Sequence, residues 1–95
     1  MRRFVIERDL PGAGNFSPAQ LRDIANTSCA VLRNMGPNIQ WVCSYVSADR
    51  IFCVYLAEDE RLLREHARRA GFPCTNISEV EHVIDPTAAA PECVA

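Results

Sequence analysis

The chain has 95 residues, of which 48% are hydrophobic and 23% charged, and its formal net charge at pH 7 is -2. We expect one small domain, and a domain of this size gains stability by burying surface against a second copy of itself. The balanced charge argues against nucleic acid as a partner. The sequence has neither the apolar core of a signal peptide nor a run of membrane-spanning length, so we expect no membrane partner.

The cysteines indicate a reducing environment. Their number is odd, and no two of them form a C-x-x-C pair, which disfavours both a disulfide framework and a zinc ribbon. They are Cys29, Cys43, Cys53, Cys74 and Cys93. The sequence therefore predicts reduced thiols and a cytoplasmic location.

The first predicted elements are a strand and a long helix. The strand runs from Phe4 to Asp9, where apolar and β-branched residues are followed by the turn "PGAG". The helix has a strong start signal, because Ser17 is placed as its N-cap, Pro18 occupies the first helical position and Gln20 closes a capping box. Apolar residues recur at helical spacing up to Met35, and "GPN" ends the run.

A hairpin, a second helix and a last strand are predicted next. The hairpin pairs residues 39–46 with residues 50–57 around the polar connection "SADR". The second helix follows acidic residues near Glu60 and ends at Gly71 after several arginines, so its charges complement the helix dipole. The stretch "ISEVEHVID", residues 77–85, predicts a last strand. The domain then spans residues 1–87, and residues 88–95 are expected to form a flexible tail.

This order of elements predicts a ferredoxin-like βαββαβ sandwich of the α+β class. In that fold a four-stranded antiparallel sheet carries both helices on one face. The hairpin has more large side chains than two solvated faces would carry, among them Trp41, Tyr45 and Tyr55. We therefore expect a homodimer that associates through the uncovered face of the sheet.

His66 is the leading candidate for a functional residue. It lies in the apolar stripe of the second helix, so its ring should face the sheet, where it needs partners for its ring nitrogens. It is either a core histidine that satisfies them locally or a metal ligand or general base. Glu7 lies on the strand beside the one that carries Cys53, and Tyr45 lies on the adjoining strand, so these groups could converge. The register of the hairpin, which the sequence leaves open, decides whether Ser44 or Tyr45 shares their face.

A carboxylate, an imidazole and a thiolate together suit Ni²⁺, Zn²⁺ or Co²⁺ better than Mg²⁺ or Ca²⁺. Simpler interpretations stand beside this one. A buried free cysteine is usually a small hydrophobic residue, and Glu7 is half of a surface ion pair if Arg8 neutralises it. Ser28 is expected to bond back to its own helix, and His82 is expected to be a solvated residue of the last strand.

Four motifs resemble a known family in sequence and in order. They are "FVIERDLPG", "WVCSYVSADRIFCVY", "EHARRAGFP" and "VIDPT", and the likeness runs from Arg3 to Thr87. The family consists of small bacterial proteins long catalogued as a domain of unknown function, some members of which are described as nickel-binding proteins. The resemblance implies a ferredoxin-like sandwich that dimerises and binds nickel, without catalysis.

The resemblance also suggests which residues bind the metal. The matching motifs supply Glu7, Tyr45, Cys53 and His66 as candidate ligands. We accordingly expect a small homodimeric nickel-binding protein, with Zn²⁺ or Co²⁺ as other candidate metals. The alternative is a dimeric α/β-barrel-type enzyme for a small organic substrate, in which His66 or Glu7 is the general base and Tyr45 or Tyr55 orients the substrate.

Overall fold

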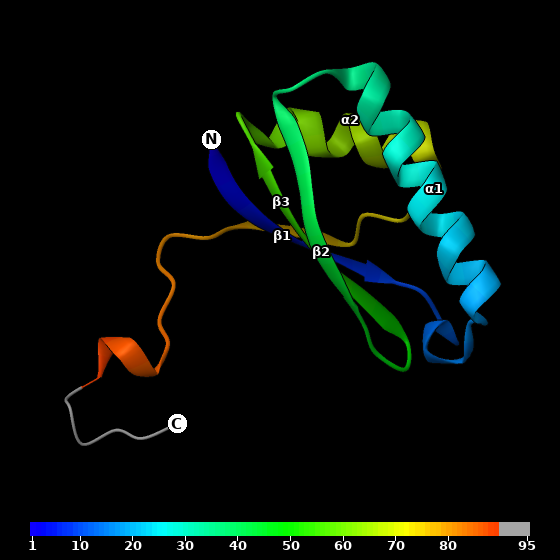
Figure 1. The fold of residues 1–95 in the computed structure, drawn as a ribbon, viewed down its shortest axis with the longest axis horizontal. Helices are drawn as coiled ribbons and strands as arrows, with labels where there is room; N and C mark the ends of the chain where they lie inside the picture. The colour runs from blue at the N-terminus through cyan, green and yellow to red at the C-terminus, as the bar shows by residue number, and fades with distance from the viewer. Residues whose placement is uncertain (90–95) are drawn as a thin grey trace.

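A four-stranded antiparallel sheet with both helices on one face makes up the computed structural model, which describes residues 1–89 (Figure 1). In chain order the elements are β1 (Arg2–Asp9), η1 (Ala13–Asn15), α1 (Pro18–Met35), β2 (Ile39–Val46), β3 (Arg50–Ala57), α2 (Glu60–Ala70), β4 (Asn76–Glu79) and η2 (Pro86–Ala88). The strands lie in the order β2-β3-β1-β4. This confirms the ferredoxin-like α+β sandwich, and the two hairpin strands begin and end where the sequence predicts.

Both helices begin and end at residues with a clear physical role. The Ser17 hydroxyl accepts a hydrogen bond from the Gln20 amide (3.1 Å), and the Ser17 amide donates to Gln20 Oε1 (2.8 Å), so the predicted capping box is complete. The Asp59 carboxylate caps α2 by accepting from the Leu62 amide. Gly71 ends α2 with a φ of 73°, in the left-handed region that favours glycine.

The core lies between the sheet and the helices, mainly under α2. Its buried side chains from β1, β3 and α2 are Phe4, Ile6, Ile51, Cys53, Tyr55, Ala57, Leu63, His66 and Ala67. By contrast, Ser28 is the buried residue that α1 contributes. The first helix is therefore packed less closely on the sheet than the second.

A β-bulge in β2 decides which residues lie on each face of the sheet. Trp41 is opposite Tyr55, but the register then shifts by one residue, so that Cys43 rather than Val42 is opposite Val54. Strict alternation would put Trp41, Cys43 and Tyr45 on one face. Because of the extra residue, Trp41 lies on the face that the helices cover and Cys43 lies on the other face. We call these two faces the covered face and the open face.

The last strand is shorter than predicted. It spans Asn76–Glu79 rather than residues 77–85, because Glu79 is already opposite Phe4 and β1 has few residues left for a longer β4 to pair with. The chain then leads away from the sheet to η2 (Figure 1). His82 consequently lies beyond β4 and is exposed, so its placement in a strand was wrong. Cys93 and residues 90–95 of the predicted tail lie outside the described part of the chain, so the tail and the domain boundary stay predictions.

Candidate functional site

His66 is fully buried on the inner side of α2, as the apolar stripe predicts. Its Nε2 shares a hydrogen bond of 3.2 Å with the Ser28 hydroxyl of α1, and its ring lies 5.4 Å from the ring of Tyr55 and 6.1 Å from that of Phe72. Burial lowers the pKa of His66 below its ordinary value, and the nearby Arg8 guanidinium lowers it further. The imidazole is therefore held neutral at physiological pH.

Arg8 is a buried residue that is not among the predicted site residues. Its side chain is only 3% exposed. Its Nε donates to Cys53 Sγ (3.4 Å), its Nη1 donates to the Pro73 carbonyl (2.7 Å), and the guanidinium lies over the ring of Phe72. Its Nη2 has no hydrogen-bond partner, and no carboxylate of residues 1–89 forms an ion pair with it. The available signal was its alternation with Phe4, which places both residues on the covered face.

The four predicted metal ligands lie on opposite faces of the sheet. Cys53 is opposite Ile6 in the register and, like His66, lies on the covered face. Glu7 and Tyr45 are both opposite Phe52, so they lie on the open face. The sheet thus prevents these four residues from sharing one ion within a chain. In the described part of the chain, no group of three or more His, Cys, Asp or Glu side chains is placed to hold a metal.

The covered-face pair does not fit a nickel ion. His66 Nδ1 is buried without a partner, which is a favourable feature for a ligand. However, Cys53 Sγ already accepts a hydrogen bond from Arg8, so a divalent cation bound there would lie beside a desolvated positive charge. Repulsion between two such charges is strong where water is excluded.

The open face carries potential metal-donor side chains and, in contrast to the covered face, has no buried arginine among them within residues 1–89. Tyr45 is 65% exposed, and the Cys43 thiol beside it raises the pKa of its phenol. Glu7 on β1 and Tyr45 on β2 are separated by β3, with Phe52 between them, so their backbones are about 10 Å apart. One chain therefore offers a thiol, a phenol and a carboxylate that suit a borderline metal chemically but are too widely spread to surround it alone.

The pairing of Ser28 with His66 joins two helices and could not be read from the sequence. A serine nucleophile needs an imidazole whose other nitrogen is oriented by a third group, usually a carboxylate. Within residues 1–89, His66 Nδ1 has no such partner. The pair therefore satisfies two buried polar groups, and the alternative enzymatic function stays a prediction.

Comparisons with known proteins agree with this fold. The model of the family "Nickel responsive protein SCO4226-like" matches residues 4–80. The crystal structure of SCO4226 from Streptomyces coelicolor A3(2) is similar, with a TM-score of 0.73 and 18% sequence identity over 86% of this chain and 99% of that one. No curated protein sequence matches the chain. None of the helices in residues 1–89 has the length and apolar character needed to cross a membrane, and the cytoplasmic location stays a prediction.

Proposed function

Because the chain belongs to the Nickel responsive protein SCO4226-like family, we propose that it binds Ni²⁺ as a homodimer. The family match over residues 4–80 is the observation that carries this proposal, since the family's description connects its members with nickel. Zn²⁺ and Co²⁺ are competing metals, because the same donor atoms accept them.

The proposed metal site lies on the open face. Two of the predicted ligands, Glu7 and Tyr45, lie there together with Cys43. Their donor atoms are a carboxylate oxygen, a phenol oxygen and a thiol sulfur, a mixture that suits a borderline transition metal. The buried charge of Arg8 lies on the other side of the sheet, which favours the open face over the pair formed by Cys53 and His66.

A second copy of the chain would complete the ligand set. The centre of the open face is apolar, with the half-buried side chains Val5, Phe52, Val54 and Leu56 on the two central strands. Two such faces related by a two-fold axis present the same surface to each other, as in isologous dimers. The interface would bury these side chains and bring a second set of the three donors to the first.

The placement of the metal can be tested by making the same type of substitution, cysteine to serine, once on each face. Titration calorimetry with Ni²⁺ compares Cys43→Ser, on the open face, with Cys53→Ser, on the covered face. We expect Cys43→Ser and Glu7→Gln to weaken nickel binding by at least about tenfold and Cys53→Ser to leave it unchanged. A loss confined to Cys53→Ser or His66→Ala would place the metal on the covered face. Failure of the parent protein to bind Ni²⁺ would contradict the proposed function itself.

The dimer has a separate test. Val54→Asp puts a charge at the centre of the open face, whereas Thr27→Asp puts the same charge on an exposed position of α1. Light scattering should then show a monomer for Val54→Asp and a dimer for both Thr27→Asp and the parent, because an unpaired charge in an apolar interface is costly. A parent protein that is monomeric at micromolar concentration with and without Ni²⁺ would contradict the homodimer.

A further inference from the structure

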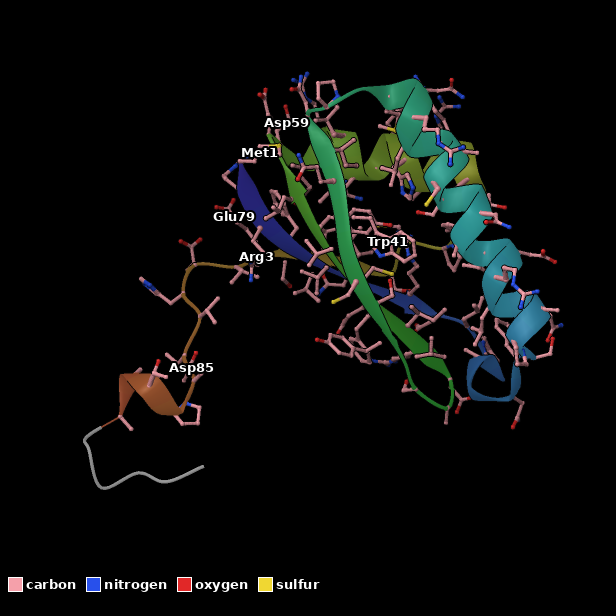
Figure 2. The ribbon with its side chains drawn as sticks, viewed as in Figure 1. Met1, Arg3, Trp41, Asp59, Glu79 and Asp85 are labelled. Atoms are coloured by element: carbon pink, nitrogen blue, oxygen red, sulfur yellow. The ribbon has the colours of Figure 1, made fainter. Side chains whose placement is uncertain are left out.

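A cavity of about 440 Å³ lies between α1 and the covered face of the sheet. Its apolar wall includes Leu10, Phe16, Leu21, Ile24, Val46 and Ile51. The cavity exists because α1 buries so little of its surface against the sheet. Figure 2 shows Trp41, another residue of the wall, in the space between β2 and α1. A cavity of this size, mostly apolar and with a few polar groups, is typical of small-molecule sites.

The polar groups of the cavity wall carry a single unbalanced positive charge. Trp41 Nε1 donates to the Ser44 hydroxyl (2.9 Å), so these two groups satisfy each other. The Ser28 hydroxyl is held by His66. Arg8 differs from these, because its Nη2 is buried in the wall without a partner and no carboxylate of residues 1–89 neutralises it.

A buried charge without a counterion is costly to keep, and an anion placed against it removes that cost. A carboxylate suits a guanidinium best, because charge-assisted hydrogen bonds between them are short and directional. The apolar wall favours a monoanion with a hydrophobic body over a strongly hydrated dianion such as phosphate. Tyr55 lines the same cavity.

We propose that this cavity binds a small hydrophobic carboxylic acid, whose carboxylate pairs with Arg8 while its apolar body fills the space between α1 and the sheet. This site lies across the sheet from the proposed metal site. Its test uses metal-free protein in the presence of a chelator, so its outcome does not depend on whether the protein binds nickel.

The test compares three probes that have the same apolar body and different charge. Octanoate, 1-octanol and octylammonium are titrated into the protein and followed by the fluorescence of Trp41, the single tryptophan of the chain, which lines the cavity. We expect octanoate to bind at least about tenfold more tightly than 1-octanol, and octylammonium to bind most weakly. Equal affinity for octanoate and 1-octanol, or no binding of either, would overturn the proposal.

Three variants assign the binding to the cavity and to Arg8. Arg8→Met removes the charge but keeps an unbranched side chain of similar length, so octanoate should then bind no better than 1-octanol. Arg22→Met removes the same charge from an exposed position of α1 and should bind like the parent. Ala25→Phe places a ring in the cavity wall and should weaken both probes, which keeps the proposal testable if Arg8→Met does not fold. Retention of the octanoate preference in folded Arg8→Met, or unchanged binding of both probes in folded Ala25→Phe, would overturn it.

Discussion

The neutral, buried imidazole of His66 should make the stability of the fold depend on pH. Burial lowers the pKa of His66 in the folded protein, whereas the unfolded chain takes up a proton near the ordinary value of 6.5. Between these two values the unfolded state binds more protons than the folded state. Acidification through this window therefore favours unfolding, and the stability that His66 contributes is complete above pH 6.5.

The size of the effect follows from one excluded proton. A difference of one bound proton changes the free energy of unfolding by at most about 1.4 kcal/mol per pH unit. In a domain of this size, each kcal/mol corresponds to about 4–8 °C in Tm. Lowering the pH from 6.5 to 5.5 should therefore lower the Tm, by several degrees at most. Carboxylates such as Glu65, whose pKa its arginine neighbours lower to about 2, lose their contribution to stability only at pH values below this range.

The measurement is thermal unfolding followed by circular dichroism at pH 7.5, 6.5 and 5.5. His66→Phe keeps a ring against Tyr55 and Phe72 but has no titrating nitrogen, so its Tm should change much less over this range. His82→Gln, at the exposed histidine, should behave like the parent. Equal changes in the parent and in His66→Phe, or a parent protein that becomes more stable on acidification, would refute the reasoning.

Three further predictions concern how the fold is held together. Ser17→Ala removes the hydroxyl that accepts from the Gln20 amide, so urea unfolding should show a loss of about 0.5–2 kcal/mol. Gly14→Ala would put a methyl group 2.9 Å from the Cα of Ala48 and should cost about 1–3 kcal/mol in the same assay; an unchanged midpoint would show that the turn after β2 yields freely. Ile6→Ala empties a fully buried position and should cost about 2–5 kcal/mol, and a loss below 1 kcal/mol would mean that the core collapses around the site.

The elements of the fold could be predicted because their signals are local. Ser17 and Gln20 fix the start of α1, and the polar connection "SADR" between two largely apolar runs indicates where the two hairpin strands lie. The length of β4 could not be predicted in this way. The apolar residues after Glu79 would suit a longer strand, but the length is set by how much of β1 remains for pairing, which is a property of the sheet.

The candidate site was less accessible to sequence reasoning, because it depends on which face each strand residue occupies. The helical stripe correctly predicts that His66 points inward. The face of the sheet on which Ser44 and Tyr45 lie depends on the bulge at Val42, and no residue pattern in the sequence predicts that bulge. Alternation along β1 does place Arg8 inward, but an arginine is so seldom buried without a partner that its charge suggests the surface.

The strand order also has a consequence for how the chain folds during its synthesis. β1 lies in the middle of the sheet, yet its neighbours β3 and β4 both come later in the sequence, after α1. The apolar residues Phe4 and Ile6 of β1 therefore have no strand to pair with until β3 has left the ribosome. At about 5–20 residues per second, the synthesis of the intervening chain takes on the order of seconds. β2 and β3, joined by a short turn, form contacts that close quickly. The hairpin is accordingly the natural template onto which the older strand β1 docks.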